Sequence, residues 1–266
     1  MNPHTYSLYA RLREPHLLEM LELREGEFVL DLGCGAGYFT ERIAENGARC
    51  CGIDTDRRSL GLARDNVPAT FICGSVTDVP IKDNTIEKAL LADVLEHVEE
   101  DERVISELCR IARDKSLLVI SVPSRDGLLS STRLHRLFHE EKGSPEYHVR
   151  NGYTLDDLKG LLERHNVRVV EVRYAVTLLG EVFLEALKLM LLLVKKDYTS
   201  QASLRDADRS LFFKLYRYII FPFMYKISRL EDLLLSKFVK GHALIIKCIV
   251  EKRTGKDIKD VSPLRG

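Results

Sequence analysis

The chain has 266 residues, which is enough for one large domain or for one medium domain with a sizeable insertion. Its 40 basic and 40 acidic side chains give a formal net charge of +0, so it lacks the whole-chain basic excess expected of a protein that coats nucleic acid. A hydrophobic fraction of 45% with 30% charged residues is ordinary for a globular protein and excludes disordered and collagen-like chains.

The six cysteines contain no C-x-x-C pair, so we expect reduced thiols rather than a zinc ribbon or a thioredoxin-like motif. Residues 1–10 are polar and lack the basic start and apolar run of a signal peptide, which favours a cytoplasmic protein. A spanning helix needs about 18 uninterrupted apolar residues. The closest candidate, 176–194, is interrupted by Glu181, Glu185 and Lys188, so we expect no such helix.

Short apolar runs alternate with segments of helical periodicity in the first half of the chain. The expected order is strand 28–32, helix 38–45, strand 49–54, helix 57–66, strand 70–73, strand 86–92, helix 99–113 and strand 116–122. Strands that are separated by helices need crossover connections, which favour a mostly parallel sheet. The predicted fold class is therefore α/β.

The pattern loosens after Pro123 and changes again before the end of the chain. Thr154 and Asp157 form a Thr-x-x-Asp variant of the capping box that opens another helix, and strands are expected over 167–174 and 242–250. Far more residues separate these strands than a hairpin needs, which predicts an insertion. The predicted organisation is a core over 1–175, a helical insertion over 176–240, a last core strand over 241–251 and a frayed tail over 252–266.

A glycine-rich stretch after the first predicted strand carries the densest chemical signal. Gly33, Gly35 and Gly37 lie between that strand and the next helix, where a missing Cβ allows positive φ and lets a ligand approach the backbone. Asp54 ends the next predicted strand, and its carboxylate can accept two hydrogen bonds from a ribose diol. Tyr38 stands where a dinucleotide fingerprint has its third glycine, which disfavours NAD. The pattern predicts an adenosine-type ligand.

The stretch Val29-Leu-Asp-Leu-Gly-Cys-Gly-Ala-Gly37 resembles motif I of the class I S-adenosylmethionine-dependent methyltransferases. The segment from Phe71 to His97 is similar to the small-molecule and lipid branch, of methyltransferase type 11, whose members often read G-D-A-x-x-L-P-F-x-D-x-S-F-D and then V-L-E-H. This resemblance implies a Rossmann-like, seven-stranded, mostly parallel sheet with helices on both faces and a helical insertion before the last strand. It also implies S-adenosyl-L-methionine as the cofactor.

The resemblance further implies a set of cofactor-binding residues. Asp31 and the backbone of the glycine stretch would serve the methionine part of the cofactor, while Asp54 would bind the ribose hydroxyls. The family often has an aspartate after the third strand, but this chain has Ser75, so Ser75 or Asp78 would supply that adenine contact. The predicted cofactor-binding residues are Asp31, Gly33, Gly35, Gly37, Asp54, Thr55, Ser75, the amide of Val76, Ala92 and Asp93.

Histidines are the candidate general bases for an acceptor that reacts through a hydroxyl or an activated carbon. His97 follows the fourth predicted strand at the cofactor edge, with a helix cap as its structural alternative. His148 lies in a region that resembles the substrate loop of the family, near Arg150, which either holds an anionic acceptor or belongs to a surface loop. His135 and His139 are four residues apart and would share one face of a helix, but no third ligand is evident, so no metal is predicted. The predicted catalytic residues are His97 and His148.

Residues 176–240 differ in composition from the rest of the chain. Seven of the chain's 20 aromatic residues lie within residues 212–225. Residues 188–240 carry 11 basic and five acidic side chains. Aromatic helices interleaved with Lys and Arg fit an interfacial element on an anionic membrane surface. The alternatives are a lid, a packed hairpin bent at Pro222 or a homodimer interface. Nucleic-acid binding is disfavoured, because apolar runs would lie beside the phosphates.

The sequence thus predicts an S-adenosylmethionine-dependent methyltransferase that acts at oxygen or carbon on a small or lipid-linked acceptor. A sugar or polysaccharide-precursor methyltransferase and a catalytically inactive cofactor-binding scaffold are the alternatives. An RNA methyltransferase ranks lower, because an N-P-P-Y-like motif is absent. We expect a cytoplasmic location, with membrane association if the insertion is interfacial.

Overall fold

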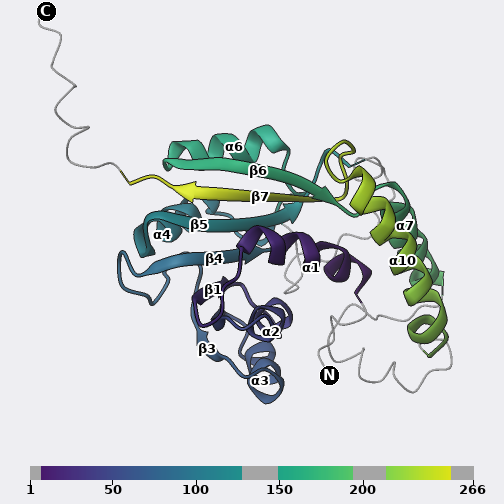
Figure 1. The fold of residues 1–266 in the computed structure, drawn as a ribbon, viewed down its shortest axis with the longest axis horizontal. Helices are drawn as coiled ribbons and strands as arrows, with labels where there is room; N and C mark the ends of the chain where they lie inside the picture. The colour runs from purple at the N-terminus through teal and green to yellow at the C-terminus, as the bar shows by residue number, and fades with distance from the viewer. Residues whose placement is uncertain (1–6, 128–148, 194–213, 253–266) are drawn as a thin grey trace, which may run out of the picture.

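The computed structural model describes residues 7–127, 149–193 and 214–252. They form a seven-stranded sheet in the order β3-β2-β1-β4-β5-β7-β6, with helices on both faces (Figure 1). The elements are α1 Leu8–Leu21, β1 Phe28–Leu32, α2 Tyr38–Glu45, β2 Arg49–Asp54, α3 Arg57–Asn66, β3 Thr70–Cys73, β4 Ile86–Ala92, η2 Leu95–His97, α4 Asp101–Ile111, β5 Ala112–Pro123, α6 Leu155–Arg164, β6 Val167–Ala175, α7 Leu178–Leu193, η3 Tyr216–Ile220, α10 Phe221–Leu235 and β7 Ala243–Val250.

The sheet is mostly parallel, as predicted. Neighbouring strands from β3 to β5 all pair in parallel, whereas β7 runs antiparallel to both β5 and β6, between which it lies. The predicted bounds of β1 to β4 are reproduced. β5 begins earlier than predicted, because Ala112 already pairs with Ile86 of β4. The register then shifts over the polar residues 113–116, and regular pairing resumes at Lys88 and Leu117. Apolar patterning cannot reveal such a polar extension.

Alternate residues of the central strands enter two separate cores. Leu118 and Ile120 of β5 pack in a cluster with buried side chains of α4 and α6. Val119, between them, points to the other face and packs in a cluster that contains residues of α1, α2 and α10. The strands therefore read as continuous apolar runs, as strands covered on both faces do.

Helix α1 was not predicted. It begins at the N-cap Ser7, whose hydroxyl accepts a hydrogen bond from the amide of Ala10 at 3.3 Å. Its apolar residues face the sheet, but Arg13 and His16 are buried on the same side. These polar side chains interrupt the apolar period by which an amphipathic helix is recognised.

In the described part of the segment before β7, helices α7 and α10 lie side by side at one end of the sheet (Figure 1). At their base the buried carboxylate of Asp232 accepts hydrogen bonds from the amides of Val176 and Thr177, at 3.0 and 2.9 Å, and from the Thr177 hydroxyl. Pro222 does not bend a regular helix. It lies in the first turn of α10, directly after the π-helical turn η3. Within the described segments, no helix combines the length and apolarity needed to cross a bilayer.

Candidate functional site

Three glycines between β1 and α2, at positions 33, 35 and 37, form the glycine loop. All three have positive φ angles, of 73°, 51° and 79°. A Cβ on Gly33 would lie 2.2 Å from Cγ2 of Val94, and one on Gly37 would lie 3.1 Å from the Cβ of Ala63, so close packing requires both glycines. A Cβ on Gly35 would meet nothing within 4 Å. The backbone at Gly35 is thus open to a ligand, and Gly33 and Gly37 shape the turn that presents it.

Asp54, at the carboxyl end of β2, holds the glycine loop in place. Its Oδ2 accepts a hydrogen bond from the amide of Gly35 at 2.8 Å, and its Oδ1 accepts one from the amide of Asp56 at 2.8 Å. Each carboxylate oxygen can accept a further hydrogen bond, because an ionised carboxylate has about four acceptor sites. The partly buried Asp54 therefore fits a ribose diol that approaches the open side of Gly35.

Asp31, in β1, is a buried carboxylate beneath the glycine loop. Thr40 of α2 donates a hydrogen bond from its hydroxyl to Asp31 Oδ2 at 2.6 Å. Burial raises the pKa of Asp31 to about 6, and the nearby charge of Asp54 adds to the rise. A cationic ligand group would offset this penalty, so the site suits the amino group of a methionine-type ligand. Sequence analysis missed Thr40, because only the packing of α2 on β1 brings it to Asp31.

The residues predicted for the adenine side lie beside Asp54, at the adjoining strand end. The carbonyl of Asp54 accepts a hydrogen bond from the backbone immediately after β3, at 3.0 Å. The hydroxyl of Ser75 accepts the amide hydrogen of Thr77 at 3.1 Å, so it closes its own turn. Val76 is buried, whereas Thr55 is exposed. These residues and Asp54 thus share one edge of the sheet, and their individual roles stay predictions.

At the end of β4, Asp93 follows the buried Ala92 with a φ of 56°, which is unusual for a residue other than glycine. Arg13 of α1 pairs both of its terminal nitrogens with the Asp93 carboxylate and donates to Ser121 Oγ at 3.0 Å. The ring of Tyr9 stacks on the guanidinium, with its centroid 3.8 Å from Arg13 Cζ. The carboxylate predicted at the methionine end is therefore already paired with a buried cation.

His97 and Glu96 lie in the 3-10 turn η2, just beyond Asp93. His97 is half-buried at the carboxyl edge of the sheet, as predicted from its position after β4. Glu96 is fully buried, and its two carboxylate oxygens have no hydrogen-bond partner among the described residues. Burial and the charge of Asp93 raise the pKa of Glu96 well above its ordinary value. Glu96 was part of the V-L-E-H stretch, but sequence analysis gave it no role.

Arg150 is held by structural contacts. Its guanidinium pairs with the carboxylate of Asp101, contacts the hydroxyl of Tyr153 and donates to the backbone carbonyl of Glu99 at 2.9 Å. Tyr153 is buried and donates to Asp101 Oδ2 at 2.8 Å. These contacts favour the structural alternative for Arg150 over the anion-binding one. The other predicted histidines, His135, His139 and His148, lie outside the described residues.

Helix α1 contacts two elements of this site, the end of β4 and the start of α2. Arg13 contacts the end of β4, and Glu14, the next residue, accepts a hydrogen bond from the hydroxyl of Tyr38, which opens α2 after the glycine loop. Arg11 pairs with the same Glu14 carboxylate at 2.9 Å. Burial raises the pKa of Tyr38 beyond its ordinary range, so its hydroxyl stays protonated and can donate.

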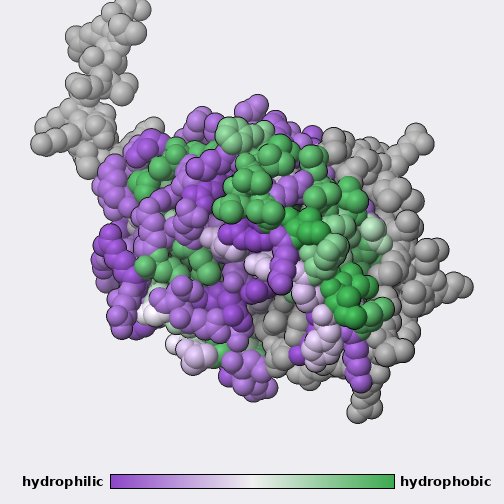
Figure 2. Space-filling view, turned by 45° about the vertical axis from the view of Figure 1, so that its right-hand side comes forward, coloured by the Kyte–Doolittle hydropathy of each residue, from purple (hydrophilic) through white to green (hydrophobic). Residues whose placement is uncertain are grey.

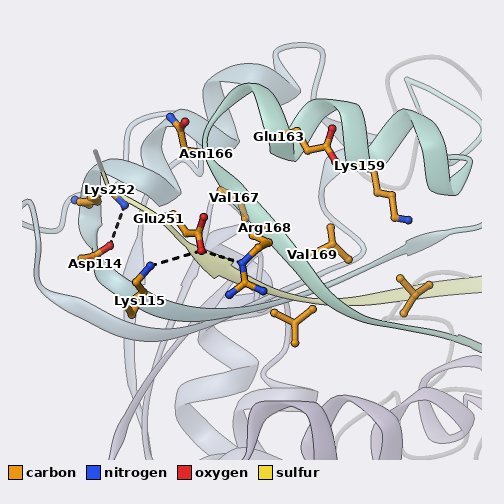
Figure 3. Close-up of a pocket in the computed structure, with 12 residues that line it drawn as sticks. Asp114, Lys115, Lys159, Glu163, Asn166, Val167, Arg168, Val169, Glu251 and Lys252 are labelled. Atoms are coloured by element: carbon orange, nitrogen blue, oxygen red, sulfur yellow. Dashed lines mark hydrogen bonds and ion pairs between the residues drawn. The ribbon is translucent and has the colours of Figure 1, made fainter. Parts of the chain in front are cut away.

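A further pocket lies at the opposite edge of the sheet, between the start of β5, α6 and the end of β7 (Figure 3). Several of its residues contact one another: Glu251 lies 3.5 Å from Lys115 and 2.8 Å from Arg168, and the backbone amide of Lys252 donates to Asp114 at 2.9 Å. In the described part of the chain no cluster of three or more metal-ligating side chains occurs.

Comparison with known families gives a match to a methyltransferase domain over residues 30–120. A probable S-adenosylmethionine-dependent methyltransferase of Mycolicibacterium smegmatis is 30% identical over 101 residues, which cover 38% of this chain and 39% of that protein. An uncharacterized methyltransferase of Synechocystis is 37% identical over 89 residues, which cover 29% of this chain and 42% of that protein. The similarity thus spans only about two fifths of the length of these curated relatives.

Several solved structures share the fold over nearly the whole chain. A putative methyltransferase of Haloferax volcanii, in complex with the Trm112 methyltransferase activator, has a TM-score of 0.57 at 14% identity, covering 92% of both chains. A SAM-dependent methyltransferase of Archaeoglobus fulgidus has a TM-score of 0.57 at 15% identity, covering 91% of this chain and 93% of that one. The cyclase SpnF has a TM-score of 0.58 at 16% identity, covering 92% of this chain and 82% of that one.

At these identities the solved structures establish the fold alone. The match to the methyltransferase domain, over residues 30–120, covers the glycine loop, Asp54 and the end of β4. The expected methyl donor of that domain is S-adenosylmethionine. Together these findings show that the chain carries, over residues 30–120, a methyltransferase domain of type 11, of the class I S-adenosylmethionine-dependent methyltransferase family.

Proposed function

We propose that the chain transfers a methyl group from S-adenosylmethionine to an oxygen or carbon atom of a small or lipid-linked acceptor. The observation that carries this proposal is the clamp of the Asp54 carboxylate on the Gly35 amide, which presents an open, positive-φ turn beside an acidic side chain. A ribose diol and the adjoining methionine chain match the hydrogen-bonding capacity of this edge.

The described residues fit the cofactor. Asp54 would hold its ribose hydroxyls, the glycine loop would lie along the methionine chain and the buried Asp31 would face the amino group. The turn of Ser75 and Val76 would border the adenine, with Thr55 outside it. When bound, the cofactor supplies a methyl carbon that is already electrophilic, so the protein's task is to orient an acceptor in line and to exclude water, which contributes about 7–11 kcal/mol.

The residues proposed to face the acceptor come from η2. His97 lies at the same sheet edge as the glycine loop, and a histidine can accept the proton of a hydroxyl acceptor near neutral pH. The neighbouring carboxyl of Glu96 is fully buried, which raises its pKa, and it is not proposed as a base. His148, outside the described residues, remains the second proposed base.

Isotopic labelling tests the proposal and identifies the acceptor class. The protein is incubated with S-adenosylmethionine labelled in its methyl group and an extract of the source cells, which is then separated into organic, aqueous small-molecule and macromolecular fractions. Label in the organic fraction would indicate a lipid-type acceptor, and label in the aqueous fraction would favour a sugar or another small acceptor. The Asp54→Ala variant is the matched control and should transfer at least about tenfold less label.

The non-enzymatic alternative is a scaffold that binds the cofactor without turnover. SpnF, a cyclase with this fold, shows that the architecture does not by itself specify methyl transfer. Binding of S-adenosylhomocysteine without label in any fraction would favour the scaffold. Absence of binding would reject the proposed cofactor site itself.

A further inference from the structure

Helix α10 departs from the usual amphipathic arrangement after its first turn, in which the apolar Phe221 and Met224 are buried. The side that faces the protein carries Ser228, Asp232 and Ser236, which follow one another at four-residue spacing and are all buried. The opposite side carries large apolar residues: Leu234 is 63% exposed, and Phe238, in the turn after the helix, is 84% exposed. A helix of a water-soluble protein normally buries its apolar stripe and exposes its polar one.

Helix α7, which packs beside α10, also buries polar side chains, next to apolar ones such as Leu184 that pack against the core. Glu181 and Glu185 are buried at four-residue spacing, whereas Leu179 and Val182 are exposed. The pair of helices therefore buries several polar groups and at the same time presents large apolar side chains outward. Because burying charge costs free energy unless it is compensated, this arrangement indicates that the outer side is adapted to something other than water.

The apolar side of η3 and α10 forms one continuous stripe, here called the outer face. Its members lie at steps of four or seven residues, so they share one side of the helix, and all are more than a third exposed: Leu215, Ile219, Phe223, Leu230, Leu234 and Phe238. Figure 2 shows hydrophobic side chains gathered over the side of the molecule that carries α7 and α10. Such a contiguous apolar surface marks a site of association.

Basic side chains outnumber acidic ones on and around the outer face. Residues 214–240 contain six basic and two acidic side chains. Lys226 lies within the stripe and Lys237 beside Phe238, and both are exposed. Both acids are engaged at the base of α7, where Glu231 accepts the Leu179 amide hydrogen at 2.8 Å and Asp232 is buried. The outer face thus combines apolar side chains with solvent-facing lysines.

We propose that the outer face docks in the interfacial layer of an anionic lipid bilayer. Leucine and phenylalanine side chains would enter the boundary between headgroups and acyl chains, while Lys226 and Lys237 would extend to anionic headgroups. A second copy of the chain fits less well, because a two-fold contact along the stripe would bring lysines of both copies together without acidic partners. A bilayer supplies the negative charge that the outer face lacks.

Docking at this face would bring the candidate site close to the membrane. α7 follows β6, and α10 precedes β7, at the carboxyl edge of the sheet, where the His242 amide donates to the carbonyl of Val176 at 3.0 Å. The ring centroids of His242 and Tyr9 lie 5.6 Å apart. Tyr9 in turn stacks on the guanidinium of Arg13, which pairs with Asp93. The inference goes beyond methyl transfer, because it depends only on the surface of the two helices.

Vesicle flotation tests the proposal without any measurement of methyl transfer. The full chain is mixed with vesicles of phosphatidylcholine and phosphatidylglycerol, and separately with vesicles of phosphatidylcholine alone. We expect the protein to float with the anionic vesicles, and a Leu230→Glu/Leu234→Glu variant to lose at least about tenfold in bound fraction. Both leucines are exposed, so the variant should keep the circular dichroism spectrum and melting temperature of the wild type.

A matched control changes an exposed apolar residue away from these helices. Val170 on β6 is 48% exposed, and Val170→Glu should bind vesicles as the wild type does. A Lys226→Ala/Lys237→Ala variant should lose at least about fivefold in its preference for the anionic vesicles. The proposal is overturned if the wild type floats with neither vesicle type, or if the leucine variant binds undiminished. A dimer in sedimentation velocity that the leucine variant dissociates would also overturn it, because the outer face would then join two copies.

Discussion

The guanidinium of Arg13, on the N-terminal helix, pairs with both carboxylate oxygens of Asp93 at the end of β4. Arg13 is 2% exposed, whereas the Asp93 side chain is 28% exposed, so the cation is buried and the anion faces the site. The pair is bidentate, which restricts its geometry as well as strengthening it. The contact fixes α1 across the edge at which the cofactor is proposed to bind.

Loss of this pair should destabilise the fold. We expect Arg13→Met to lower the free energy of unfolding by about 2–3 kcal/mol, because it leaves Asp93 without its partner in a partly dry environment. Urea denaturation at neutral pH measures the change. Arg11→Met is the control, since its pair with Glu14 is more exposed and should contribute less than about 1 kcal/mol. Equal losses in both variants would contradict a special role for the Arg13 contact.

Asp54 should control cofactor affinity. Asp54→Ala removes the proposed ribose acceptor and the clamp on Gly35, so S-adenosylhomocysteine should bind at least about tenfold more weakly in calorimetry. Asp56→Ala is the matched control, because Asp56 caps α3 through the amides of Arg58 and Ser59, at 3.0 and 3.2 Å. It should lower stability by about 1 kcal/mol and leave affinity unchanged. Unchanged affinity in Asp54→Ala would remove Asp54 from the site.

Asp31 should favour binding of the cofactor while lowering the stability of the fold, and the loss of stability should depend on pH. Its pKa of about 6 in the fold lies above its ordinary value of 3.8, so the carboxyl's favourable contribution is complete below about pH 4 and is lost as the pH rises through 6. Asp31→Asn should therefore raise the free energy of unfolding by about 2–3 kcal/mol at pH 8, with little gain at pH 4. The same variant should weaken S-adenosylhomocysteine binding. Paired denaturation curves at the two pH values check the difference, and a gain that is independent of pH would contradict the assignment.

Two glycines of the loop should respond differently to alanine. Gly35→Ala places its Cβ in open space, so it should cost only about 1–2 kcal/mol from the positive φ while obstructing the cofactor. Gly33→Ala forces its Cβ against Val94 and should destabilise the fold further. Thermal melts and calorimetry with S-adenosylhomocysteine separate the two effects. Full affinity in a folded Gly35→Ala protein would show that no ligand approaches this turn.

Much of the sheet could be predicted, because buried parallel strands are continuous apolar runs and the motif residues lie at their ends. The capping box at Thr154 was predicted and is confirmed. The backbone amide of Asp157 donates to the Thr154 hydroxyl at 3.1 Å, and the Asp157 carboxylate accepts from the Thr154 amide. Such short-range patterns depend on local geometry alone, so a single sequence reveals them.

The parts of the site that escaped prediction depend on contacts between distant segments. Arg13 reads as a surface residue until α1 is placed on Asp93 and Ser121, and Thr40 reads as a helix residue until α2 is packed on Asp31. Glu96 is conspicuous only once its burial is known. Sequence periodicity shows which face of an element is apolar, but it does not show which polar groups the tertiary fold brings together.

The position of β7 has a consequence for the order in which the protein is assembled. β7 lies between β5 and β6, so β6 has no neighbour in the sheet until residues 243–250 are available. During synthesis β5 would therefore present an unpaired edge while the residues of α7 and α10 are translated. A ribosome-bound chain that stops before β7 should be sensitive to proteases around β6, and the final strand should close the sheet in a single late step.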